Sequence, residues 1–146
     1  MIAGEYKSPI KAQDYHQNRF SGNLWYIHND EMKLIEKWIS QQTKKPNNIL
    51  DLGTGTGRAI KSLLKFNPEK IYALDQSPAM LRILEENYLK EIKSGKVKTI
   101  VGTSEKISLP TKTLDLAISL HVFKHIKNLK PTLIEVNQVL KPGGIL

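Results

Sequence analysis

Apolar and polar positions change period along the chain, and the change predicts an alternation of strands and helices. Continuous apolar runs predict strands over residues 48–53, 70–75, 97–102 and 114–120. Helical spacing predicts helices over residues 57–66, 78–94 and about 130–140. Ser77 and Pro78 suit the cap and the first position of the second of these helices. Strands that alternate with helices favour a mostly parallel sheet with helices on both faces.

The part before the first predicted strand divides into two segments. Residues 1–28 are polar and aromatic without a clean period. A helix then begins at Asn29 or Asp30, carries apolar side chains at helical spacing, and stops at the Lys44-Lys45-Pro46 sequence. The expected domain organisation is an N-terminal lid or arm over residues 1–28 and one ligand-binding domain over residues 29–146.

The turn after the first strand is the most informative segment. Residues 49–57 read Ile-Leu-Asp-Leu-Gly-Thr-Gly-Thr-Gly, with glycines at alternate positions. Glycine allows positive φ and close approach of a ligand, and a helix N-terminus follows. A dinucleotide-binding turn would place its third glycine three residues after the second, but Gly57 follows Gly55 by two and Arg58 takes the expected place. A pyrophosphate ligand is therefore not expected.

Asp51 indicates a different ligand, because an acid before the glycines repels phosphate and suits an ammonium group. The stretch from Ile49 to Gly57 resembles the first motif of class I S-adenosylmethionine-dependent methyltransferases, and the resemblance extends over about residues 30–146. It implies a Rossmann-like sheet of order 3-2-1-4, with a rudimentary fifth strand as an option, and S-adenosylmethionine as cofactor. The alternative is that the motif is only a strand followed by a tight turn.

The resemblance also assigns cofactor contacts along the strand ends. Asp75 ends the second strand about twenty residues after the turn, where its carboxylate can accept both ribose hydroxyls. Gln76, Ser77 and Met80 follow near the adenosine, although Met80 fits core packing equally. The full set of expected cofactor residues is Asp51, Gly53, Thr54, Gly55, Gly57, Asp75, Gln76, Met80, Thr103, Ser104, Glu105, Ser119 and Leu120.

The adenine end departs from the family pattern. Relatives carry Gly-Asp-Ala-Glu after the third strand, where the Asp contacts the adenine amino group, but this chain reads Gly-Thr-Ser-Glu. Thr103 can accept a neutral hydrogen bond worth about 1 kcal/mol, against about twice that for a charged one. Weaker cofactor binding is expected, with Ser104 and Glu105 as further contacts.

The end of the fourth strand is the expected reaction centre. Ser119-Leu120-His121-Val122 lacks the Pro-Pro-aromatic motif of amino-methylating enzymes and looks more like the small-molecule branch that includes quinone-biosynthesis methyltransferases. His121 is the candidate general base for a hydroxyl or amine acceptor, because imidazole titrates near neutrality. Its alternatives are a place beside the methionine moiety or a strand cap. His125 is expected to be structural, and no metal site is expected.

The chain's last residues, Leu140-Lys-Pro-Gly-Gly-Ile-Leu146, resemble the family's turn into its fifth strand. We therefore expect a domain that is incomplete at its C-terminus, with an exposed edge on the fourth strand that favours self-association and with weak or no activity of its own. A further expectation from the resemblance is that the aromatic N-terminal segment folds over the cofactor as a lid; core packing is the alternative.

Composition narrows the chemistry. The 146 residues contain no cysteine, so thiolate metal sites and a cysteine nucleophile are excluded. We expect a cytoplasmic protein, since no apolar run has the length of a membrane span and the N-terminus does not resemble a signal peptide.

The net charge of +8 raises the question of nucleic acid. Only Arg19, Arg58 and Arg82 are arginines, and no aromatic-interleaved basic run occurs, so a solvated lysine-rich surface is favoured over a nucleic-acid groove. The expected function is methyl transfer to an O, N or C nucleophile of a small molecule. The alternatives are a catalytically idle cofactor-binding module that acts through a partner chain, an RNA or protein methyltransferase, and, more distantly, a nucleotide-dependent oxidoreductase.

Overall fold

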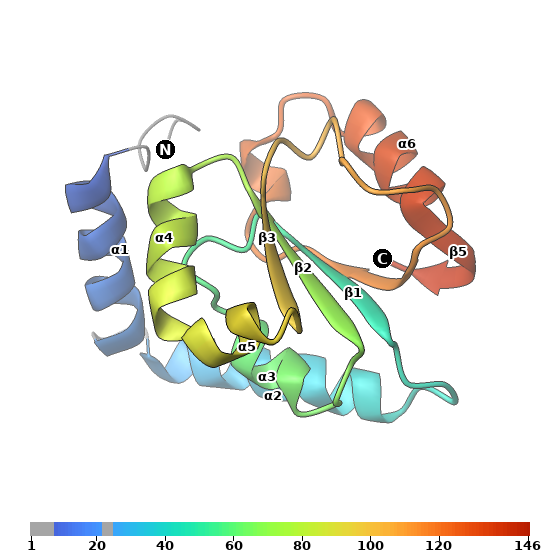
Figure 1. Cartoon of the computed structure of the whole chain (residues 1–146), viewed down its shortest axis with the longest axis horizontal. Coiled ribbons are helices and arrows are strands. Elements are labelled where there is room, and N and C mark those ends of the chain that lie inside the picture. The colour runs from blue at the N-terminus through green and yellow to red at the C-terminus, as the bar shows by residue number, and fades with distance from the viewer. Residues whose placement is uncertain (1–7, 22–24) are drawn as a thin grey trace.

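The computed structural model describes residues 8–21 and 25–146, and its centre is a five-stranded parallel sheet (Figure 1). The strands lie in the order β3-β2-β1-β4-β5, which confirms the predicted order and adds the fifth strand to it. Their bounds are β1 Asn48–Leu52, β2 Lys70–Asp75, β3 Val97–Val101, β4 Leu114–Ile118 and β5 Leu140–Ile145. From β1 to β3 each new strand is added on one side of β1, and the chain then crosses to the other side of β1 to form β4, as in doubly wound folds.

Helices cover both faces of the sheet, as the alternation of elements predicts (Figure 1). They are α1 Pro9–Ser21, α2 Trp25–Ser40, α3 Ile60–Leu64, α4 Pro78–Asn87, α5 Leu89–Lys93, the 3₁₀ turn η2 Phe123–His125, and α6 Leu129–Val139. Ile49 of β1 packs in one core cluster with side chains of α2, α3 and α4. Leu50, which points to the other face, packs in a second cluster with Val136 of α6.

The helices differ from the predicted ones in four places, and the first is that the helix expected over residues 57–66 spans only Ile60–Leu64. A helix, α1, occupies residues of the segment that shows no clean period, and its buried Ala12 packs against α4. The predicted helix start at residue 29 is wrong, because α2 begins at Trp25 and crosses the expected boundary between arm and domain. The predicted helix over residues 78–94 is interrupted at Tyr88, which turns to pack against Gly57.

The expectation of an exposed fourth strand is also wrong. β4 pairs with β1 on one edge and with β5 on the other, and Leu114 and Leu116 are buried. β5 already begins at Leu140, and a bulge lies between its pairing of Leu140 with Leu114 and its pairing of Ile145 with Leu116. The Pro-Gly-Gly sequence that predicts a turn is accommodated in this bulge. The outer strands of the sheet are therefore β3 and β5.

Candidate functional site

The glycine turn is held at the carboxyl ends of β1 and β2, where parallel sheets bind ligands. The backbone amides of Gly53 and Thr54 both donate to the carbonyl oxygen of Leu74, at 2.8 and 3.0 Å. Gly57 donates to the carbonyl oxygen of Thr54 at 3.1 Å and closes the turn. These bonds place residues 53–57 directly above the last residues of β2.

The three glycines have positive φ but serve different purposes. A Cβ on Gly53 (φ +72°) would lie 2.3 Å from Cγ2 of Val122, and one on Gly57 (φ +88°) would lie 2.9 Å from the ring of Tyr88. A Cβ on Gly55 (φ +58°) would meet nothing within 4 Å. The outer two glycines therefore allow protein packing, whereas Gly55 exposes its backbone to open space, where a ligand can approach.

Asp75 braces the same turn and keeps acceptor capacity. Its Oδ2 accepts from the amide of Gly55 at 2.9 Å, and its Oδ1 accepts from the amide of Ser77 at 2.8 Å. Burial raises the pKa of Asp75, although these backbone hydrogen bonds oppose the change. The backbone amide of Gln76 is a third donor to this carboxylate, which has about four acceptor positions, so about one position is left for a ligand hydroxyl. Ser77 also caps α4 through the amide of Met80, as predicted.

Asp51 lies beneath the turn and is only 2% exposed. Its Oδ2 accepts from the hydroxyl of Thr54 at 2.6 Å. Burial raises the pKa of Asp51 to about 7; the Thr54 hydrogen bond opposes the rise and the charge of Asp75 adds to it. Asp51 therefore holds the glycine turn through Thr54, and its pKa lies near neutral pH. A direct contact between Asp51 and an ammonium group stays a prediction.

An unpartnered polar atom lies at the end of β4. The hydroxyl oxygen of Ser119 is buried, and no hydrogen-bond partner for it occurs among the described residues. Leu120, the next residue, packs partly against the core cluster beneath β1. Since buried hydroxyls are normally paired, Ser119 fits a site completed by a ligand, and with Gly55 and Asp75 it offers the polar, close-approach surface that a nucleoside needs.

The predicted adenine residues are spread more widely. Thr103 and Glu105 are exposed after β3, and the hydroxyl of Ser104 is 3.0 Å from that of Thr132 on α6. Gln76 is exposed at the end of β2. Met80 is 4% exposed and packs with Ala12 of α1 and Ala79, which agrees with its packing alternative. Contacts of these residues with a cofactor stay predictions.

His121 takes part in a polar cluster that sequence reasoning missed. Its Nε2 lies 2.7 Å from Oε1 of Glu31 on α2, and the other oxygen of Glu31 accepts from the guanidinium of Arg58. Arg58 also donates through Nε to Nδ1 of His28, at 2.9 Å. His121 has φ +61°, in the left-handed region. The acid of this cluster lies ninety residues before the histidine, so no local motif could have indicated the pair.

The N-terminal helix reaches the glycine turn as well. Nδ1 of His16 on α1 is 3.0 Å from the hydroxyl of Thr56, which is buried within the turn. Burial lowers the pKa of His16, so the neutral imidazole is favoured at this contact. The turn is thus contacted from both α1 and α2. The aromatic content of the segment was the only sequence signal for such contacts, and Tyr6 lies outside the described residues.

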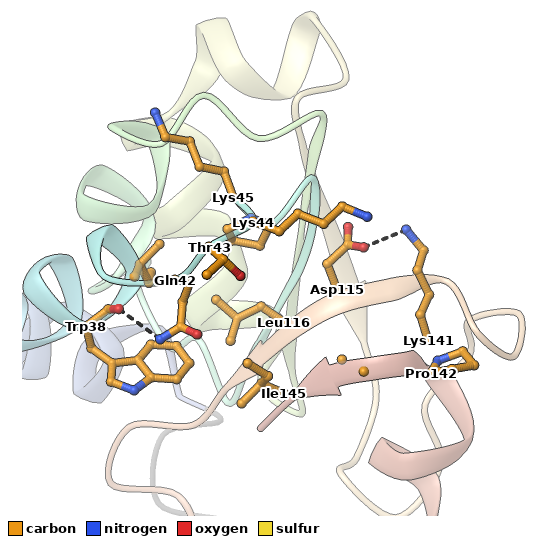
Figure 2. Close-up of a pocket in the computed structure, with 14 residues that line it drawn as sticks. Trp38, Gln42, Thr43, Lys44, Lys45, Asp115, Leu116, Lys141, Pro142 and Ile145 are labelled. Carbon is orange, nitrogen blue, oxygen red and sulfur yellow. Dashed lines mark hydrogen bonds and ion pairs between the residues drawn. The ribbon is translucent and has the colours of Figure 1, made fainter.

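A cavity of about 200 Å³ lies at the opposite end of the sheet (Figure 2). It is lined by Trp38 and by the start of β4 and β5, and Lys141 points across it to Asp115 at 2.8 Å. None of the predicted site residues lines this cavity. The polar groups that can still accept hydrogen bonds lie at the carboxyl end of the sheet, so that end is the better candidate for the ligand site.

Two searches of the described residues have negative results. No helix among residues 8–21 and 25–146 is long and apolar enough to cross a membrane. No group of three histidine, aspartate or glutamate side chains that could hold a metal ion occurs in the same ranges.

Comparison with known proteins identifies similar chains. The profile of a family described as a methyltransferase domain matches residues 50–146. O-methyltransferase 3 of Dictyostelium discoideum is 26% identical over 96% of this chain and 35% of its own length. Sterol 24-C-methyltransferase ERG6A of Gibberella zeae is 26% identical over 92% of this chain and again 35% of its own length. The chain thus spans about a third of each of these relatives.

Solved structures agree on the fold. A SAM-dependent methyltransferase of Aquifex aeolicus superposes with a TM-score of 0.71 and 24% identity, over 92% of this chain and 68% of that chain.

Proposed function

The chain belongs to the methyltransferase-domain family, whose cofactor is S-adenosylmethionine, and from this premise we propose that it transfers a methyl group from S-adenosylmethionine to a small-molecule acceptor. The observation that carries the proposal is the arrangement at the carboxyl end of the sheet. There an open glycine follows β1, a braced carboxylate ends β2 and an unpartnered buried hydroxyl follows β4, at the ends of neighbouring parallel strands.

The residues present fit the cofactor. Asp75 would accept a ribose hydroxyl with the acceptor position that its three backbone hydrogen bonds leave free. Gly55 allows the ligand to approach the backbone, and Ser119 offers the methionine portion a hydrogen bond that the protein does not satisfy. The bound cofactor supplies an electrophilic methyl group on a sulfonium.

The protein's part in the reaction is mainly positioning. Displacement at a methyl carbon needs the acceptor atom about 3 to 3.5 Å away and in line, and a base is needed only when the acceptor carries a proton that must leave. His121, at the end of β4, is the proposed base for such acceptors. The two relatives named above are an O-methyltransferase and a sterol C-methyltransferase, which supports small-molecule acceptors without choosing between oxygen and carbon.

We also propose that the N-terminal segment acts as a lid. Support comes from α1, whose His16 contacts the turn residue Thr56, and from the start of α2, where His28 accepts a hydrogen bond from Arg58 at 2.9 Å. Helices that touch the turn from outside can exclude water when the site is filled. The same segment would then form one wall of the acceptor pocket.

Calorimetry with S-adenosylmethionine, S-adenosylhomocysteine and NAD tests the cofactor. We expect saturable binding of both sulfur ligands and none of NAD. Binding of NAD alone would refute the proposal.

A screen of phenols, carboxylic acids, amines and sterols with labelled methyl donor then tests the activity. Cofactor binding with no transfer to any acceptor would favour the alternative, an idle module that acts through a partner chain.

A further inference from the structure

The Glu31 carboxylate joins two segments that are far apart in the sequence. Its Oε2 accepts a hydrogen bond from the guanidinium of Arg58, just after the glycine turn, and its Oε1 is 2.7 Å from Nε2 of His121 after β4. The Arg58 side chain is 8% exposed and that of Glu31 is 26% exposed. Two partners on different oxygens fix the carboxylate in position and orientation.

This contact determines which nitrogen of His121 carries a proton. An ionised carboxylate can only accept hydrogen bonds, so Nε2 must be the donor. In the neutral imidazole the lone pair then resides on Nδ1. A histidine that serves as a base in this arrangement takes the proton at Nδ1, while Glu31 holds the ring from the other side.

The pair is anchored on the predicted cofactor turn from both sides. Val122, the neighbour of His121, packs on Gly53 so closely that a Cβ there would clash with it. Arg58 immediately follows Gly57, the last glycine of the turn. His121 also has φ +61°, a conformation that costs a non-glycine residue about 1 to 2 kcal/mol and persists when its surroundings hold it.

We propose that Glu31 is a positioning residue for His121: it holds the imidazole as the Nε2–H tautomer, so that Nδ1 faces a protonated acceptor as the base. The inference rests on the proposed function. In the step it serves, the acceptor's hydroxyl proton moves to Nδ1 as the acceptor oxygen bonds to the methyl carbon. The carbon–sulfur bond breaks, and its electron pair stays on sulfur, which becomes a neutral thioether.

Arg58 has a defined part in this arrangement. Its positive charge next to Glu31 favours the ionised carboxylate, and it offsets part of the field that an isolated carboxylate would exert on the imidazole. Glu31 therefore orients His121 more than it raises the basicity of the ring. An acid without Arg58 would favour the imidazolium, which cannot accept a proton.

Nitrogen-15 NMR of the whole chain tests the pairing without any acceptor. At pH 8 we expect His121 to show a protonated Nε2, with a slowly exchanging ring N–H, and an unprotonated Nδ1. In Glu31→Gln the pH midpoint of His121 should fall and the ring N–H should exchange faster. Among the described residues, hydrogen bonds connect the ring to Glu31 and, through it, to Arg58 and His28; Lys124 and His125 follow on its own segment.

A matched control lies on the same helix. Glu36 also bonds from α2 to the segment after the turn, with Ser62 at 2.7 Å and Lys65 at 2.6 Å, but it has no contact with His121. Glu36→Gln should leave the His121 signals unchanged. An Nδ1–H tautomer in the parent chain, or equal responses to the two glutamate substitutions, would overturn the proposal.

Turnover on the acceptor that the screen identifies gives the second measurement. Glu31→Gln should lower kcat by about 10- to 100-fold and leave the KM for S-adenosylmethionine within about threefold, as expected for loss of an oriented base. In a His121→Ala background, Glu31→Gln should have no further effect. Additive losses in this double-mutant cycle would show that Glu31 acts on stability or binding instead.

The same variants separate failure of this inference from failure of the proposed function. If the parent chain does not bind S-adenosylhomocysteine in calorimetry, the proposed function is wrong whatever the NMR shows. If it binds normally but His121 lacks the Nε2–H signal, the function survives and the positioning role of Glu31 is refuted.

Discussion

At the two ends of the sheet the protein shifts the pKa of an acidic side chain in opposite directions. At the amino end, burial alone would raise the pKa of Asp115, but Lys141 and the backbone amides of Asn48 and Asn47 donate hydrogen bonds to it and lower the pKa. At the carboxyl end, burial dominates and raises the pKa of Asp51 to about 7. Asp115 has all the donors and the counter-charge that it needs within the protein.

This difference separates a structural acid, Asp115, from the acids proposed to bind the ligand. Asp115 ties the start of β1 to β4 and to Lys141, and both of its carboxylate oxygens accept hydrogen bonds within the protein. Asp51, Asp75 and Ser119 leave polar capacity that the described protein does not fill. Unfilled polar capacity, more than the presence of a cavity, indicates where a cationic or hydroxyl-rich ligand binds.

The largest expected effect compares Gly53 with Gly143, which both have positive φ. Gly53→Ala should lower the free energy of unfolding by about 2 to 5 kcal/mol, because the left-handed backbone and the overlap with Val122 add together. Gly143→Ala, with nothing within 4 Å of its Cβ, should cost about 1 to 2 kcal/mol. Urea unfolding of both variants measures the difference, and equal losses would contradict the packing role of Gly53.

Gly55→Ala sharpens the same comparison. Its Cβ also meets nothing within 4 Å, so its loss of stability should match that of Gly143→Ala. Binding of S-adenosylhomocysteine should nevertheless weaken in Gly55→Ala and remain normal in Gly143→Ala. Normal binding in both variants would mean that the ligand does not approach the backbone at Gly55.

The next effect compares Asp75 with Asp115. Asp75→Ala should weaken binding of S-adenosylhomocysteine by about 1 to 3 kcal/mol, because charged contacts with the ribose are lost. Asp115→Ala should leave the affinity unchanged and lower the stability instead, since Lys141 and two backbone amides lose their acceptor. Calorimetry on folded variants decides the matter, and an unchanged affinity in Asp75→Ala would place the ribose elsewhere.

A smaller effect follows from the pKa of Asp51. Because the free protein holds this pKa at about 7, and because a cationic ligand favours the carboxylate, binding should release a proton and tighten as the pH rises. For a decrease of about one pKa unit on binding, the affinity should increase about fivefold between pH 6 and pH 8. Asp51→Asn should flatten this dependence, whereas a substitution of Asp115 should not. A profile that is the same in the parent and in Asp51→Asn would contradict the prediction.

The smallest effect concerns the lid. Limited trypsin cleavage at Lys11 of α1 should slow when S-adenosylhomocysteine is added, because the helix that contacts Thr56 is held more firmly against the filled site. Cleavage at Lys44, beside the cavity at the amino end, serves as the control and should not change. Equal rates at Lys11 with and without ligand would argue against a lid.

The sequence by itself determined where the strands and the glycine turn lie, and the resemblance to a known family supplied the order of the strands in the sheet. Apolar runs such as Ile49–Leu52 read as buried parallel strands, and glycines at alternate positions have few other uses, so local periodicity and backbone freedom were sufficient. Ser77 with Pro78 likewise indicated the start of α4 correctly. Helix α1 escaped notice because, among residues 9–18 whose burial is described, only Ala12 is fully buried, which leaves a weak apolar pattern.

Only the tertiary structure decided how the site is completed. Gly53 packs on Val122 and Gly57 packs on Tyr88, both of which are far away in the sequence, whereas Gly55 faces open space. The partner of His121 is Glu31, an acid that looks locally like an ordinary helix residue. The packing of whole helices on the sheet determines which side chains pair across tens of residues. The pattern of neighbouring residues along the chain does not contain that information.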